Sequence, residues 1–430
     1  MFEKLRKLNK EQVYSVLHQL VMAVYGFGLL FVLYRTSSKE ETGRWLLFMS
    51  AISLADMLLH GFLQTTVIRR IAAVKGNKAA IDKIASNAFY FAITLWLSIS
   101  VVFMGASQLF SLQLLEDLKW YPLLGFMMLM YNVSWWVGHG LLDFKSILLQ
   151  RIVFCLVSSL LLLAFYQHGG QLFTNDIIIS QVFAYGVSAT IGWLVIRKIK
   201  LSFNLFDIEV LDYFMKYGKF TSGSMLLSSL LRNADVFMIA GFLGQASVAV
   251  YGAAQKMVEV FEVGLRGMAS HALPDFCRSA HDHKGLLKKY VVISALLIFL
   301  FTPVALLMAI FAEWVIGIIS GSSQYLGAAN VLRILMVYVL FLVVDRMTGI
   351  VLEALGLASY NLRKTMLLVL VNVVGNFIAL YFFQSIIAVA VVSIVAALVG
   401  TGAGLYFTVQ YMGITLTAQH FKRGYQLIIK

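Results

Sequence analysis

Residues Trp45–Ile68 read WLLFMSAISLADMLLHGFLQTTVI, an apolar run that contains two ionisable side chains, Asp56 and His60. A helix of roughly 20 apolar residues crosses the hydrocarbon core of a bilayer. In lipid the backbone must satisfy its own hydrogen bonds, so a continuous apolar run indicates a helix, whereas the strands of a barrel alternate over about ten residues. This stretch therefore predicts a transmembrane helix with polar groups inside it.

Similar apolar runs recur along the chain. The 430 residues are 60% hydrophobic and only 13% charged, and the mean hydropathy is +0.84, which is far above what a water-soluble domain needs. We expect an all-α polytopic membrane protein with about 12 spans. They run approximately over 13–34, 45–68, 88–109, 121–142, 147–166, 177–196, 220–241, 248–273, 290–311, 330–349, 366–383 and 386–409.

Lysines and arginines favour one side of the membrane. They cluster in alternate connections: residues 4–10, 69–83, 197–219, 278–289 and 363–364, and again at 422–430. By the positive-inside rule, these segments and both termini are predicted to be cytoplasmic. The net charge of +13 then reflects topology, so we expect anionic membrane lipids rather than nucleic acid as partners.

The chain is predicted to have two six-helix lobes, 1–200 and 220–430, joined by a cytoplasmic amphipathic linker at 201–219. An internal comparison supports two halves. At an offset of 206 positions (262 − 56), Asp56, His60 and Gly61 coincide with Glu262, Arg266 and Gly267. An acid, a base four residues later and a glycine thus recur, and repeated halves are a common way to build transporters around a central site.

Charged side chains inside spans are costly and usually face a cavity or a partner. The second span presents Ser53, Asp56, His60 and Gln64 on one helical face. The eighth presents Gln255, Glu259, Glu262, Arg266 and Ser270, with Lys256 at the edge, and the seventh contributes Ser224, Ser228, Arg232 and Asp235. Two readings stay open: intrahelical ion pairs that only lock the bundle, such as Arg232 with Asp235, or a cavity for a charged substrate and a coupling cation.

Two further groups of polar residues have alternative explanations. In the fourth span, Trp135 offers an aromatic face to a sugar ring and Asn132 an amide to its hydroxyls, although aromatic residues also populate interfacial belts. In the eleventh span, Asn372 and Asn376 lie four residues apart and suit either substrate contact or hydrogen bonds between helices.

Catalytic motifs are absent from the sequence. It has no nucleotide-binding Gly-rich loop, no nucleophile elbow and no His/Cys cluster with metal spacing. The two cysteines, Cys155 and Cys277, suggest neither a disulfide framework nor a metal site. We therefore expect no enzyme activity, no cofactor and no bound metal.

One segment resembles a known family. Residues 233–256, NADVFMIAGFLGQASVAVYGAAQK, are similar to the segment that opens the second half of bacterial polysaccharide flippases, members of the multidrug/oligosaccharidyl-lipid/polysaccharide exporter superfamily. Residues 42–45, 56–70 and 321–334 resemble the corresponding parts of the same family. Length, span number and the central linker agree along the whole chain.

The resemblance implies two lobes that alternate between inward-open and outward-open states in the inner (plasma) membrane. The implied cargo is an undecaprenyl-diphosphate-linked oligosaccharide for O-antigen, capsule or exopolysaccharide. Arg232, Lys256 and Arg266, with His60, are the implied diphosphate contacts, because guanidinium and ammonium groups suit phosphate oxygens. Resetting would use a cation carried by an acid. The three acids proposed for that role are Asp56, Glu259 and Glu262.

Other functions remain open from the sequence alone. The first alternative is a cation-coupled exporter of drugs or other small amphipathic molecules, although the first span lacks the proline and acid typical of drug exporters. A membrane-embedded polymerase or acyltransferase would usually need a large external loop, and a purely structural subunit would tolerate loss of the cavity charges. A polysaccharide polymerase and a chain-length regulator are the protein partners that the resemblance implies.

Overall fold

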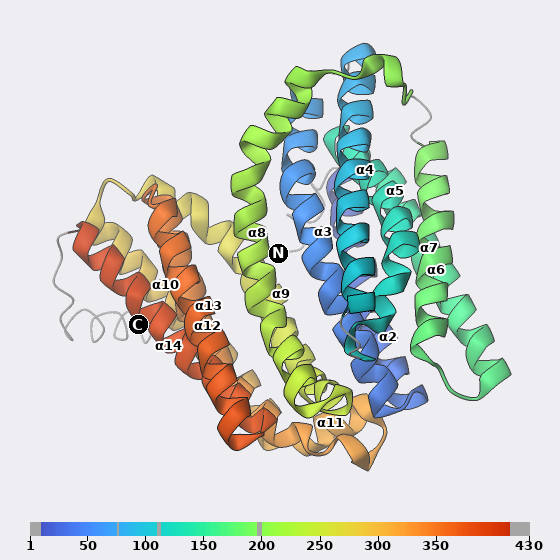
Figure 1. Ribbon diagram of the computed structural model, residues 1–430. Helices are drawn as coiled ribbons and strands as arrows, with labels where there is room; N and C mark the ends of the chain where they lie inside the picture. Colours follow the sequence, from blue (N-terminus) through green and yellow to red (C-terminus); the bar gives the residue numbers. More distant parts are fainter. Residues whose placement is uncertain (1–9, 75–76, 110–112, 196–199, 413–430) are drawn as a thin grey trace. The chain divides into compact units, whose positions relative to one another are not determined.

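Every regular element that the structure describes is helical (Figure 1). The computed structural model describes residues 10–74, 77–109, 113–195 and 200–412; the basic residues expected near both termini and the start of the central connection lie outside them. The predicted all-α membrane fold is confirmed. The helices of the first half are α2 (Lys10–Thr36), α3 (Lys39–Ala73), α4 (Lys78–Leu109), α5 (Tyr121–Gly140), α6 (Phe144–Gly169), α7 (Thr174–Val195) and α8 (Ile208–Leu243), with 3₁₀ turns η1 (Gln113–Trp120) and η2 (Phe203–Leu205).

The second half repeats this plan of long helices joined by short turns. Its helices are α9 (Gln245–Arg278), α10 (His283–Ile310), α11 (Ala312–Ser320), α12 (Ala328–Ala354), α13 (Ala358–Phe383) and α14 (Ile386–Met412), with the 3₁₀ turn η3 (Ser323–Tyr325) before α12. Residues with short polar side chains start several helices. Ser38, Asp143 and Asp282 each accept a hydrogen bond from a backbone N–H in the first turn, which satisfies a donor that the helix leaves free.

The chain divides into two compact units, Met1–Ser229 (unit 1) and Leu230–Lys430 (unit 2). The boundary falls inside α8, which continues without a break from the predicted linker into the predicted seventh span. The segment predicted as an amphipathic linker, 201–219, contains the start of α8. Phe214 is fully buried in the core of unit 1, while Ile208 is exposed, so this segment is one wall of unit 1.

Ten described helices are long and apolar enough to cross a membrane. The two other predicted spans correspond to α5 and α9, which form helices but are less apolar. The sequence of α5 contains Asn132, Trp135 and His139, and that of α9 contains two acid–base pairs. Polar residues thus lower the hydropathy of α5 and α9, whereas α3 and α8, which also contain polar residues singled out in the sequence, remain among the ten.

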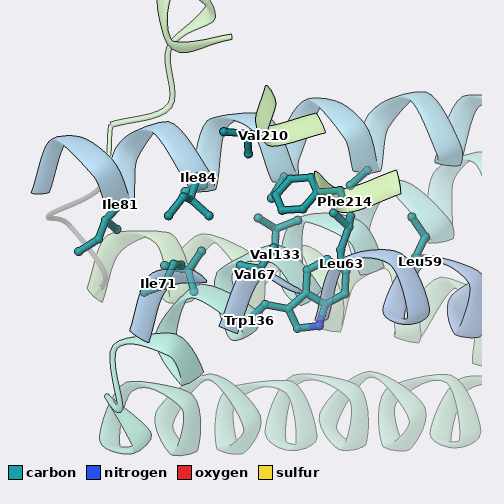
Figure 2. Packing of buried hydrophobic residues seen from close by; sticks show 14 of the residues in the cluster. Leu59, Leu63, Val67, Ile71, Ile81, Ile84, Val133, Trp136, Val210 and Phe214 are labelled. Atoms are coloured by element: carbon teal, nitrogen blue, oxygen red, sulfur yellow. The ribbon is translucent and has the colours of Figure 1, made fainter. Parts of the chain in front are cut away.

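The core of unit 1 lies where α3, α4, α5 and the start of α8 meet. Figure 2 shows Phe214 and Val210 from α8 directed toward Val133 of α5 and Val67 of α3. Two glycines allow α8 to approach α3 closely. A Cβ at Gly218 would come within 2.6 Å of the Phe62 ring, and one at Gly61 would overlap the backbone of Ser222. This close crossing fixes the orientation of α3, and with it the direction of the helical face that contains Asp56 and His60.

Unit 2 is organised around α12, which packs against α9, α10 and α14. Its core includes Leu265 and Phe276 of α9, Tyr290 of α10 and Met347 of α12. The buried positions of α9 recur every three or four residues, as expected for a helix packed on one face. Glu259, Glu262 and Arg266 each follow a buried position by one residue, about 100° around the helix, so the packing of unit 2 leaves this charged face partly uncovered.

Candidate functional site

A hydrogen-bonded triad links α3 to α5 in unit 1. The Asp56 carboxylate accepts a hydrogen bond from Asn132 Nδ2 (2.8 Å) through Oδ1 and lies 3.2 Å from His60 Nδ1 through Oδ2. His60 Nδ1 is also 2.9 Å from the Asp56 carbonyl oxygen. The structure thus brings together three residues that the sequence analysis assigned to separate roles, cation coupling, sugar contact and phosphate contact.

Two tryptophans surround the His60 ring. Trp136 meets it edge-on at 5.2 Å between ring centroids, and Trp135 lies 5.9 Å away. Trp136 is almost fully buried in the core. The predicted sugar-stacking face of Trp135 has a different neighbour, because the guanidinium of Arg151 lies 5.2 Å from its ring centroid.

Arg151 was missed by the sequence analysis, although its neighbour Trp135 was considered there as a sugar contact. Arg151 lies two turns into α6, near one end of a predicted span, where a basic residue is easily taken for an interfacial anchor. It interacts electrostatically with His18 of α2 and His139 of α5. Side chains from the consecutive helices α5 and α6 and from the distant α2 thus converge in one group. Only the spatial pairing of α2, α5 and α6 reveals this group.

The charged face of α9 is divided into two intrahelical pairs. Lys256 Nζ is 2.7 Å from Glu259 Oε1, and Arg266 Nη1 is 3.2 Å from Glu262 Oε2. All four side chains are partly exposed, from 26% for Lys256 to 47% for Arg266. Two of the predicted phosphate contacts are therefore paired with two of the predicted cation carriers, and the pairs remain accessible to a competing ligand.

Arg232 and Asp235 do not pair with each other. The side chain of Asp235 is buried in unit 2, where it accepts hydrogen bonds from Tyr251 Oη and Asn376 Nδ2, both at 2.7 Å. Arg232 is exposed and its carbonyl accepts a hydrogen bond from Gln255 Nε2. The ion pair considered in the sequence analysis is thus wrong. Asn376 thus links α13 to α8, and it also donates to Asn372 Oδ1 within α13 at 3.3 Å.

A second buried charge in unit 2 has a counterion. Lys364 Nζ lies 2.8 Å from Asp345 Oδ1 and also donates to the Asp345 carbonyl. The Lys364 side chain is only 4% exposed, so this pair is a structural link between α12 and α13. Among the described residues, no group of three or more His, Cys, Asp or Glu side chains is placed to hold a metal ion.

An apolar cavity of about 700 Å³ lies between α5 and α7 in unit 1. Its lining includes Leu123, Met127, Ile179, Val182 and Phe183. These side chains suit a hydrocarbon chain better than a sugar or a phosphate, since they offer no hydrogen bonds. The polar site of unit 1 is therefore built from other residues of α5.

Comparison with known proteins identifies the family. A family model for polysaccharide biosynthesis proteins matches residues 32–330. The chain belongs to this family. The teichuronic acid biosynthesis protein TuaB of Bacillus subtilis (strain 168) is 23% identical to this chain over 183 residues. That match covers 42% of this chain and 38% of TuaB, so it spans well under two thirds of the relative.

Solved structures show that this family member shares the fold of the MOP transporters. Lipid II flippase MurJ in an inward closed conformation has a TM-score of 0.74 at 14% identity, covering 96% of this chain and 89% of MurJ. An inward-facing multidrug resistance MATE transporter of the MOP superfamily has a TM-score of 0.72 at 18% identity, covering 95% and 100%. At such low identities the likeness shows the fold alone. The resemblance stated from the sequence is confirmed.

Proposed function

We propose that this protein flips an undecaprenyl-diphosphate-linked oligosaccharide from the cytoplasmic to the outer leaflet of the inner membrane, for O-antigen, capsule or exopolysaccharide assembly. The observation that carries the proposal is the charged face of α9, which unit 2 leaves uncovered in a member of a polysaccharide biosynthesis family. Charges on a membrane helix are too costly to face lipid, so this face is directed at an aqueous path.

The chemistry of the uncovered face suits a diphosphate. Arg232 is exposed and forms none of the ion pairs in the described part of the chain. Its guanidinium is free to bind phosphate oxygens in a bidentate manner. Lys256 and Arg266 would join it by exchanging their carboxylate partners for phosphate. The released Glu259 and Glu262 would then be available to a coupling cation.

Transport can proceed without catalysis. An inside-negative potential favours outward movement of an anionic headgroup, by about 2.3 kcal/mol per elementary charge per 100 mV. Alternating access by the two units would move the headgroup, and a cation bound at Asp56, Glu259 or Glu262 would reset the empty carrier. In this topology both termini are cytoplasmic, and a polymerase and a chain-length regulator use the flipped product.

The test is a flipping assay in proteoliposomes, which follows a fluorescent undecaprenyl-diphosphate oligosaccharide between leaflets. Loss of a bidentate phosphate contact costs about 1.4 kcal/mol or more, so Arg232→Ala should slow flipping about tenfold. Arg333→Ala is the matched control, because Arg333 also lies in unit 2 but pairs with Glu313 at 2.9 Å. It should flip at the wild-type rate.

Two outcomes would contradict the proposal. Equal rates for wild type and Arg232→Ala would remove Arg232 from the headgroup path. No flipping by the wild type, with a membrane potential and both proton and sodium gradients imposed, would favour the alternative function, a cation-coupled exporter of small amphipathic molecules.

A further inference from the structure

A group of polar side chains in unit 1 contains buried nitrogen atoms that have no hydrogen-bond partner. The unpartnered atoms are both ring nitrogens of His18, Nδ1 of His139, Nε of Arg151 and Nε1 of Trp135. His18 is only 3% exposed. Buried polar groups in native proteins are nearly always satisfied, and each unsatisfied one needs an explanation. Here several occur together on α2, α5 and α6.

The side chains form one continuous cluster. The His18 ring stacks on Phe144 at 6.0 Å between centroids, and the His139 ring meets the same Phe144 edge-on at 5.1 Å. His139 lies 6.2 Å from Trp135, and the guanidinium of Arg151 lies 5.2 Å from the Trp135 ring. Phe144, at the start of α6, thus holds both histidine rings in the same cluster as Trp135 and Arg151.

The charge of the cluster is not compensated within the described part of the chain. None of the ion pairs there includes Arg151. The nearby carboxylates have other partners. Asp56 is bound by His60 and Asn132, Asp143 by Ser146, and Glu11 accepts from the Phe144 backbone N–H. Arg151 therefore has no carboxylate at ion-pair distance among the described residues, and the site is rich in donors.

We propose that Arg151, His18, His139 and Trp135 form a binding site for a phosphate group in the interior of unit 1. A guanidinium and an indole N–H only donate, and each imidazole donates from at least one nitrogen. A phosphate offers several strong acceptor oxygens and the negative charge that Arg151 lacks, so one ligand satisfies the whole cluster. This site is separate from Arg232, Lys256 and Arg266, all of which belong to unit 2.

Three sources offer this chemistry: the diphosphate of a lipid-linked glycan, the phosphate of a membrane lipid, and a free inorganic anion. Only the first rests on the proposed function. Binding itself does not require transport, so a carrier that fails to flip glycans would still bind phosphate here, and a flippase without this site would still flip.

The experiment measures anion binding by the purified full-length protein in phosphatidylcholine nanodiscs. Inorganic pyrophosphate is titrated by calorimetry, and undecaprenyl phosphate and phosphatidylglycerol are compared by native mass spectrometry. Arg151→Gln should weaken pyrophosphate binding about tenfold or more, equivalent to about 1.4 kcal/mol. Arg151→Lys should retain part of the affinity, because it keeps the charge but loses the planar fork. His139→Ala should weaken binding less than Arg151→Gln.

The control is Arg35→Gln. Arg35 also lies over an aromatic ring, Phe31, at 4.1 Å in the same unit, but it is outside the cluster and its loss should leave binding unchanged. Preference for undecaprenyl phosphate over phosphatidylglycerol identifies a lipid-linked glycan as the source, the reverse identifies a membrane lipid, and pyrophosphate binding alone identifies a free anion.

The proposal is overturned if the wild type shows no saturable binding of any of the three probes, which would mean that water alone satisfies the cluster. Equal affinity of the wild type, Arg151→Gln and His139→Ala would also overturn it. If Arg151→Gln does not fold, Arg151→Lys and His139→Ala decide the question by the same comparison.

Discussion

The helices α3 and α9 contain the same acid–base motif in different surroundings. Asp56 with His60 in α3 and Glu262 with Arg266 in α9 are separated by four residues, and both pairs close at 3.2 Å. In α3 the acid is also bonded to Asn132 of α5 and the pair is packed beside two tryptophans. In α9 the pair remains partly exposed. The two halves thus place one motif inside a unit and the other on an uncovered face.

This difference indicates that the two acid–base pairs have different roles. A pair fixed by a third residue from another helix is expensive to disturb, because each buried group depends on the others. An ion pair on an exposed face contributes little free energy, so its two side chains can exchange partners easily. We therefore expect changes at the α3 pair to affect stability most, and changes at the α9 pair to affect transport most.

The largest effect on stability is expected for Asn132→Leu. The change removes the donor to Asp56 Oδ1 and leaves a half-buried carboxylate oxygen unpaired, at a cost of about 1–3 kcal/mol. Thermal and denaturant unfolding of the purified protein would measure this loss. Thr94→Val is the control, since Thr94 is exposed and bonds only to the carbonyl of Phe91 in its own helix. Equal stability of the two variants would show that the triad is not a structural unit.

A smaller effect on stability is expected when Glu262 and Arg266 are exchanged. The double variant Glu262→Arg/Arg266→Glu keeps both charges at the same spacing, so its unfolding free energy should stay within about 1 kcal/mol of the wild type. Flipping in proteoliposomes should nevertheless fall about tenfold, equivalent to 1.4 kcal/mol, if the arginine binds the headgroup. Wild-type flipping by the exchanged protein would mean that the pair is only structural.

The smallest effect is expected for an ion pair outside the spans. Lys83 bonds to Asp207 and, with the backbone N–H of Glu209, lowers the pKa of the Asp207 carboxyl from its usual 3.8. A carboxyl with a lowered pKa in the folded state stabilises above its unfolded pKa, and this contribution is lost as pH falls through the folded value. Lys83→Ala should therefore be slightly less stable than wild type at neutral pH. The difference should vanish in acid below the lowered pKa of Asp207, and a difference that persists there would contradict the assignment.

Much of the fold follows from the sequence because the bilayer imposes a simple rule. Each predicted span lies in a helix, and only the ends differ by several residues, since α3 and α9 continue well beyond their apolar stretches. The central connection was predicted as an amphipathic linker, without a partner for its apolar face. In the structure Val210 and Phe214 are buried in unit 1. Amphipathicity shows which face of a helix is apolar, but it does not show which other element packs against that face.

The candidate site was predicted in part. Helical spacing correctly placed Asp56 with His60 and Glu262 with Arg266, because residues four apart share a helical face. The same reasoning failed for Asp235. Its spacing from Arg232 suggested a pair, but Tyr251 and Asn376 from other helices provide better hydrogen bonds at 2.7 Å. Arg151 was missed because the histidines and the tryptophan of the cluster lie on other helices, α2 and α5, and helical spacing within α6 does not reveal them.

By itself, the sequence determined the class of the protein: an all-helical membrane protein whose long apolar helices contain polar groups. The physical reason is that a backbone in lipid must satisfy its hydrogen bonds locally, so apolar length alone specifies each span. Only the tertiary structure decided which polar groups meet. Contacts such as Asn132 with Asp56, Asn376 with Asp235 and Arg151 with Trp135 depend on how helices pack, which no local spacing encodes.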